Sequence, residues 1–157
     1  MASIFWAFVP AALLHIAEEY VFPGGFPEAV RRLNPRLASA ATPTFHLILN
    51  ALFIVLVVVG AFIGESGLVF SLAIAGLLFY NALFHLVGTV MGRRYVPGLI
   101  TGLAVYLPLS TYALAAYLCQ AKINLGDLVS IGLLGMGLQL SPFAVLALFR
   151  WQAQENT

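Results

Sequence analysis

Five long apolar stretches constrain this chain more than any other feature. A membrane-spanning helix needs about 20 consecutive apolar residues. Of the 157 residues, 62% are hydrophobic and only 8% are charged, whereas a soluble domain has about 25% charged residues. We therefore expect an all-α integral membrane protein, a bundle of five transmembrane helices. The predicted spans cover residues of about 3–22, 44–63, 68–91, 99–118 and 128–149.

Short breaks with turn or helix-start chemistry separate these stretches. The segment Pro23–Gly25 stops the first stretch, and Pro43 is suited to open the second. Pro97 precedes the fourth stretch, and Pro142 predicts a kink within the fifth. There is no soluble segment or low-complexity linker, so we expect one transmembrane domain over residues 1–157.

The basic residues predict the orientation of the chain in the membrane. Six arginines lie in the connections after the first, third and fifth stretches, and only Lys122 falls on the other side. Because cytoplasmic connections carry an excess of Lys and Arg, we expect the N-terminus outside and the C-terminus in the cytoplasm, in a bacterial inner (plasma) membrane. A cleaved signal peptide is not expected, since its basic leading region is absent. The arginines are Arg31, Arg32, Arg36, Arg93, Arg94 and Arg150.

The longest cytoplasmic connection, residues 26–41, has two interpretations. Its apolar residues recur at helical spacing opposite Arg31 and Arg32, which predicts a short helix lying on the inner membrane surface. A simple charged loop that stops membrane transfer fits equally well. The apolar positions are Phe26, Val30, Leu33 and Leu37.

The rest of the composition excludes several classes of partner and site. The net charge of +1 gives no reason to expect a nucleic-acid partner. A single cysteine, Cys119, allows no disulfide framework within the chain and behaves as a small hydrophobic residue. The expected partner is a lipid or another hydrophobic small molecule, and an oligomer is compatible with the sequence.

All three histidines fall inside predicted spans, where ionisable groups are costly. Each such group costs roughly 2.5 kcal/mol or more near the bilayer centre on insertion scales. Each histidine has a polar companion three or four residues away, which places both on one helix face. Three helices therefore each present one polar patch. The patches are His15 with Glu18 and Glu19, His46 with Asn50, and Asn81 with His85.

Helix direction predicts that these patches lie at one depth. The first and third stretches run inward and the second runs outward, so the two glutamates, His46 and His85 all lie in the cytoplasmic half. At about 1.5 Å per residue, His15, Asn50 and Asn81 lie about one turn deeper. By this reasoning the glutamates are better placed than His15 to contact a shared ligand.

Three imidazoles and two carboxylates at one depth are the ligand types of a zinc or non-haem iron site. A lone Asn or His in a membrane helix often only bonds to a neighbouring helix, and tyrosines often form an interfacial belt. Seven colocated residues favour a functional site. The predicted ligands are His15, Glu18, Glu19, His46 and His85; the supporting or substrate-contacting residues are Asn50, Asn81, Tyr95, Tyr106 and Gln139.

The segment His15–Glu19 resembles the motif that gives the HXXEE-domain membrane protein family its name. Two later segments, Asn81–His85 and Tyr95–Gly98, also look like blocks of that family, so the resemblance runs from the first span to the fourth. It implies a metal-dependent membrane enzyme whose site is the motif and the two later histidines. A weaker resemblance to CAAX-type intramembrane proteases rests on the paired glutamates and on His46 with Asn50, in a different order.

The leading hypothesis is a metal-dependent enzyme acting on a lipid or prenyl-like substrate at the cytoplasmic leaflet. A divalent ion, zinc or iron, would activate water for hydrolysis with Glu18 or Glu19 as general base. An alternative is a lipid oxidase or hydroxylase with non-haem iron. Two irons usually need more carboxylates than are present, and membrane desaturases carry more histidines.

Three further alternatives need no catalytic metal. A Glu/His pair could isomerise or cyclise a terpenoid lipid by acid–base catalysis. A proton or metal-ion transporter would use intramembrane Glu and His, but here the polar groups stay in one leaflet. A haem anchor held by His46 and His85 leaves the paired glutamates without a role.

Overall fold

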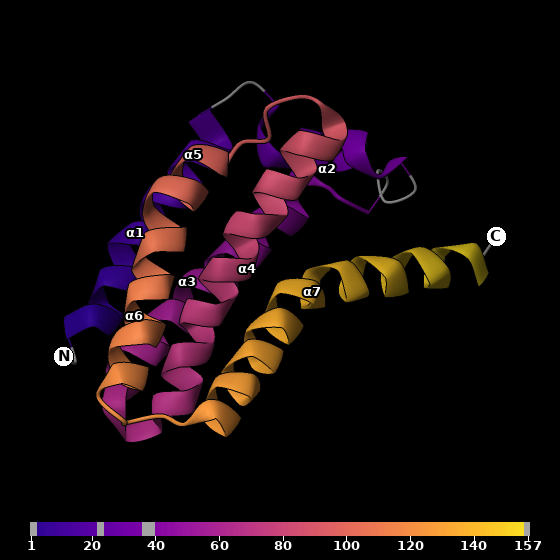
Figure 1. The fold of residues 1–157 in the computed structure, drawn as a ribbon. Helices are drawn as coiled ribbons and strands as arrows, with labels where there is room; N and C mark the ends of the chain where they lie inside the picture. Colours follow the sequence, from indigo (N-terminus) through magenta and orange to yellow (C-terminus); the bar gives the residue numbers. More distant parts are fainter. Residues whose placement is uncertain (1–2, 22–23, 36–39, 156–157) are drawn as a thin grey trace.

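The fold was obtained as a computed structural model, which describes residues 3–21, 24–35 and 40–155. The described residues form helices and short connections, and contain no strand, so the expected all-α class is confirmed. Figure 1 shows the helices running up and down in one bundle. In chain order they are α1 (Ser3–Val21), α2 (Gly25–Leu33), α3 (Pro43–Ile63), η2 (Gly64–Gly67), α4 (Leu68–Gly92), α5 (Leu99–Thr101), η3 (Gly102–Tyr106), α6 (Leu107–Cys119) and α7 (Leu125–Glu155).

Four helical stretches are long and apolar enough to cross a membrane, by length and composition. One of them, the 50-residue stretch Pro43–Gly92, contains both α3 and α4. The 3-10 turn η2 joins these two helices, so α3 and α4 fold back on each other as a hairpin (Figure 1). The other three stretches are Ile4–Val21, Leu99–Cys119 and Leu125–Leu148.

Helix α4 lies at the centre of the bundle. Every residue from 71 to 78 is buried, and α4 packs against α3, η3, α6 and α7. Its contact with α7 is a close backbone approach, since a Cβ on Gly135 would lie 2.7 Å from the carbonyl carbon of Gly76. Small residues at such a crossing allow two helices to approach closely. This contact places α7 beside α4.

The helix α2 lies in the connection between the first two apolar stretches, where a short helix was one of the two interpretations. Val30 is buried with Ala41 and Leu146, whereas Arg32 is exposed. Residues 36–39, with Arg36 and Leu37, lie outside the described part of the chain, as does the side chain of Arg150. Figure 1 shows α2 at the same end of the bundle as the connection between α4 and α5.

The fourth apolar stretch contains one turn of π-helix, η3, between α5 and α6. Such π-bulges are rare and occur frequently at functional sites. Thr101 and Tyr106, at the two ends of this segment, are both buried in the bundle.

Helix α7 contains Pro142, as expected for a kinked helix. Figure 1 shows α7 bent partway along its length, with its C-terminal half leaving the bundle. α7 packs mainly on α4.

Candidate metal centre

Three buried side chains from two helices converge near the end of the bundle that carries α2. Nε2 of His85 lies 3.4 Å from Oε1 of Glu19, and Nε2 of His15 lies 3.6 Å from the same oxygen. The three residues are at most 5% exposed. One ligand atom from each lies within 4.8 Å of the other two, the spacing of a metal-binding group. His15 and Glu19 are one turn apart on α1, and α4 presents His85 to them.

The hydrogen bonds around Thr101 determine which nitrogen of His15 faces Glu19. The Thr101 hydroxyl donates to Oε2 of Glu18 at 2.5 Å, because an ionised carboxylate can only accept. The hydroxyl has one proton, so it must accept from Nδ1 of His15, which lies 2.8 Å away. A neutral His15 then carries its lone pair on Nε2. This lone pair points toward Glu19, which is also an acceptor.

A cation bound between these atoms would satisfy them. Neither Nε2 of His15 nor either ring nitrogen of His85 has a hydrogen-bond partner among the described residues. Zinc bonds His nitrogen and carboxylate oxygen at about 2.0–2.2 Å, so the ligands of a tetrahedral ion lie about 3.3 Å apart. The observed separations of 3.4 and 3.6 Å fit that geometry. The donor set also suits zinc or non-haem iron.

Glu18 has a different role from its neighbour. Its two carboxylate oxygens accept hydrogen bonds from five donors, which lie at the start of the fourth apolar stretch and in the connection before it. Burial and the hydrogen bond to Glu18 raise the pKa of Tyr95, so its hydroxyl stays protonated and donates. The structure thus places Glu18 as an anchor for this segment. The donors are the Tyr95 hydroxyl, the backbone N–H groups of Gly98, Ile100 and Thr101, and the Thr101 hydroxyl.

The same segment holds the His85 ring in place. Gly98 has a φ of 101° and lies so close to the imidazole that a Cβ there would be 2.4 Å from Cε1 of His85. Phe26 of α2 packs against His85, with ring centroids 4.9 Å apart. The Tyr106 ring stacks on His15 at 4.3 Å, and its buried hydroxyl has no hydrogen-bond partner among the described residues.

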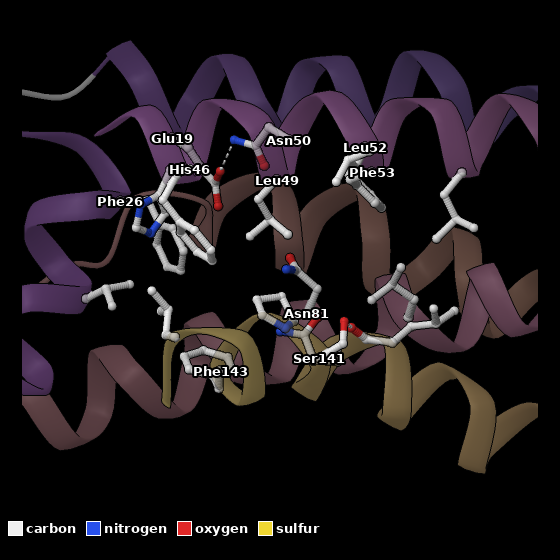
Figure 2. Close-up of a pocket in the computed structure, with 18 residues that line it drawn as sticks. Glu19, Phe26, His46, Leu49, Asn50, Leu52, Phe53, Asn81, Ser141 and Phe143 are labelled. Atoms are coloured by element: carbon white, nitrogen blue, oxygen red, sulfur yellow. Dashed lines mark hydrogen bonds between the residues drawn. The ribbon is translucent and has the colours of Figure 1, made fainter. Parts of the chain in front are cut away.

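A cavity of about 340 Å³ begins at Glu19 and extends between α3 and the pair α4 and α7. Asn50 donates to Oε2 of Glu19 at 3.2 Å (Figure 2). Figure 2 shows Asn50 and Asn81 pointing toward the cavity from opposite sides, while its other end is lined by leucine and phenylalanine side chains. The candidate metal centre therefore borders a largely apolar space.

His46 lines this cavity and is not part of the three-residue cluster. Its Nδ1 lies 2.9 Å from the Thr42 carbonyl oxygen, which can only accept, so Nδ1 carries a proton. A neutral His46 then has its lone pair on Nε2. Phe26 contacts both His46 and His85, with ring centroids 5.7 and 4.9 Å away.

The structure brings together some of the residues predicted from sequence and separates others. Of the five predicted ligands, His15, Glu19 and His85 form the cluster, whereas Glu18 and His46 do not join it. His15 was predicted to lie a turn too deep, but its side chain reaches Glu19. The predicted supporting residues lie in three places. Asn50, Asn81 and Gln139 line the cavity, Tyr106 stacks on His15, and Tyr95 binds Glu18.

Four residues of the site were not identified from sequence in these roles. Thr101 and Thr42 each accept a hydrogen bond from Nδ1 of a histidine, Gly98 packs on His85, and Phe26 covers it. Gly98 could have been identified from the sequence, because the segment Tyr95–Gly98 resembles a block of the HXXEE family. No spacing pattern indicated Thr101, because its partners lie on α1, more than 80 residues away in the sequence.

A family model described as "Protein of unknown function with HXXEE motif" matches residues 6–113. This range includes the three residues of the cluster and Thr101. No curated protein and no solved structure matches the chain.

Proposed function

This chain belongs to the HXXEE family, and we propose that it is a metal-dependent membrane enzyme acting on a hydrophobic, lipid-like substrate. The ligands of the proposed divalent ion, zinc or iron, are His15, Glu19 and His85. The substrate reaches the site through the adjoining cavity. The favoured reaction is hydrolysis.

One observation carries this proposal: two imidazole nitrogens and one carboxylate oxygen converge in a buried place, and neither nitrogen has a hydrogen-bond partner among the described residues. Buried polar groups are normally satisfied, and leaving one unsatisfied costs about 1–3 kcal/mol. Here His15 Nε2, Glu19 Oε1 and His85 Nε2 all face one another. A bound cation satisfies all three at once, and the apolar cavity beside it accounts for a hydrophobic substrate.

Each residue then has a distinct task. A divalent ion supplies Lewis-acid chemistry at such a site. Glu18 is not available as a general base, because both of its oxygens are occupied by protein donors. His46 is better suited to accept a proton, because the Thr42 carbonyl orients its ring and its Nε2 is free of hydrogen bonds in the described structure.

A single ion is favoured over the two irons of an oxidase. The cluster offers only one carboxylate, and Glu18, the other candidate, is held by the backbone of residues 98–101. Proteins that hold two irons in a helix bundle usually supply about four carboxylates.

We infer five membrane spans with the N-terminus outside and the C-terminus in the cytoplasm of a bacterium. The spans are α1, α3, α4, the continuous stretch from α5 to α6, and α7. Arg31 and Arg32 on α2 and Arg93 and Arg94 after α4 then share the cytoplasmic side, which agrees with the positive-inside rule. The metal centre lies in the cytoplasmic half of the membrane.

Elemental analysis of the purified protein tests the proposal. We expect about one equivalent of zinc or iron per chain, lost on His85→Ala and on His15→Gln. The matched control is His46→Ala, which should keep its metal because His46 lies outside the cluster. A metal-free wild type that stays helical after exposure to both ions would contradict the proposal and favour acid–base isomerisation. About two irons per chain would favour the oxidase.

The hydroxyl of Thr101 should tune metal affinity without touching the ion. Thr101→Val leaves Nδ1–H of His15 without an acceptor, and loss of the partner that hydrogen-bonds a ligating histidine typically weakens metal binding by about 10–100-fold. Thr101→Ser keeps the hydroxyl and should bind normally. Competition with a chelator measures both affinities. Equal affinities for Thr101→Val and wild type would show that Thr101 does not fix the ring of His15.

A further inference from the structure

We propose that the cavity beside the metal centre binds a lipid with a single chain and an uncharged, hydrogen-bonding head group, such as a long-chain alcohol. This inference rests on the proposed function, since it names the lipid class for that same site: a long-chain alcohol is the product that hydrolysis of an uncharged lipid ester releases. The head group lies near Asn81 and Gln139, and the chain lies between α3 and α7.

The size of the cavity favours one chain. Its volume of about 340 Å³ is close to the lower end of the range for ligand sites, which is about 300–1,000 Å³. Most of the lining consists of apolar side chains from facing helices. They include Leu49, Leu52, Phe53 and Leu56 of α3, with Leu138 and Leu146 of α7.

The cavity opens sideways, out of the bundle. Leu52 lines it and is 62% exposed, so its mouth lies on the outer surface of α3. Ser141, also in the lining, is exposed on α7. If α3 and α7 span the membrane, this mouth faces lipid. A ligand with a long apolar chain can therefore enter without crossing water.

Polar groups inside the cavity specify the head group. The side-chain oxygen of Asn81 is buried and has no hydrogen-bond partner among the described residues, so it needs a donor. Gln139, on the facing helix α7, is 9% exposed and lines the same space. A hydroxyl group can donate to Asn81 and accept from the Gln139 amide, because it has one proton and two lone pairs.

The charge of the lining opposes a strongly anionic head group. Among the described residues, no Lys or Arg lines the cavity, and Glu19 is the only acidic residue in its lining. One divalent ion paired with Glu19 leaves a single positive charge. A phosphate or diphosphate, which is bound best by several charged donors, would be left largely unpaired in a low-dielectric site. An uncharged head group carries no such cost.

Photo-crosslinking with a diazirine analogue of hexadecanol tests the inference on the purified full-length protein. We expect labelled peptides from residues 49–56 and 138–146. Unlabelled hexadecanol should compete better than hexadecanoic acid or hexadecyl phosphate. Stronger competition by the acid or the phosphate, or labelling spread evenly over all apolar helix faces, would overturn the inference.

Substitutions of the polar residues in the cavity provide a second test of the inference. Asn81→Leu should weaken competition by hexadecanol about tenfold, the effect of losing one buried hydrogen bond. The matched control is Asn34→Leu, which changes an exposed asparagine outside the cavity. A normal affinity for Asn81→Leu would overturn the assignment of the head group.

Metal content, measured on the same samples, separates this inference from the proposed function. Asn81 lies outside the proposed ligand set of His15, Glu19 and His85, so Asn81→Leu should retain its ion. Hexadecanol labelling outside the cavity in a metal-loaded wild type overturns only the lipid class. A wild type that binds hexadecanol in the cavity but no metal overturns only the metal-dependent function.

Discussion

Replacing Gly98 with alanine should destabilise the protein and abolish metal binding together. Gly98 has a φ of 101°, a conformation that costs other residues about 1–3 kcal/mol. The added Cβ would also lie 2.4 Å from Cε1 and 2.8 Å from Nε2 of His85. Neither atom can move away without an energetic cost, because Phe26 packs against the His85 ring. We therefore expect a loss of at least about 2 kcal/mol in unfolding free energy.

Thermal unfolding followed by circular dichroism and elemental analysis measure the two effects of Gly98→Ala. Gly137→Ala is the matched control, because Gly137 lies within α7 and a Cβ there meets no atom within 4 Å. Alanine is favoured over glycine inside a helix by about 0.5–1 kcal/mol, so this control should be neutral or slightly stabilising. If Gly98→Ala unfolds like wild type and keeps its metal, Gly98 does not support His85.

The arrangement of the helices follows from properties that are local in the sequence. Apolar length predicts each helix, and Pro43 is at the first position of α3 as expected. Helix direction then brings the C-terminal end of α1 level with that of α4. This is why Glu19 and His85 were expected at one depth, and the structure places them 3.4 Å apart. The number of spans stays a prediction, because composition alone does not separate α3 from α4.

The details of the site depend on side-chain direction, which depth alone does not give. Residues adjacent in a helix point about 100° apart, so Glu18 and Glu19 cannot face the same neighbours. Glu19 points with His15 toward His85, whereas Glu18 points toward Thr101. Their different roles became visible only once the path of residues 95–101 was known, and that path depends on the positive φ of Gly98.

Isosteric substitution should therefore distinguish the roles of the two glutamates of the motif. Glu19→Gln removes the only charged ligand of the cluster, so metal content should fall below about a tenth of wild type. In chelator, however, its unfolding temperature should match or exceed that of wild type. The reason is that an amide can donate to a histidine nitrogen, and a buried charge is removed.

Glu18→Gln should give the opposite pattern. Its amide nitrogen would face N–H and O–H donors in place of a carboxylate oxygen, so at least one donor is left unsatisfied at a cost of about 1–3 kcal/mol. Metal should still bind, more weakly, because His15, Glu19 and His85 are all present. Unfolding temperature in chelator and metal content, measured on both variants side by side, distinguish the roles. If both variants lose metal and stability to the same extent, the glutamates act as one unit and the division between ligand and anchor is wrong.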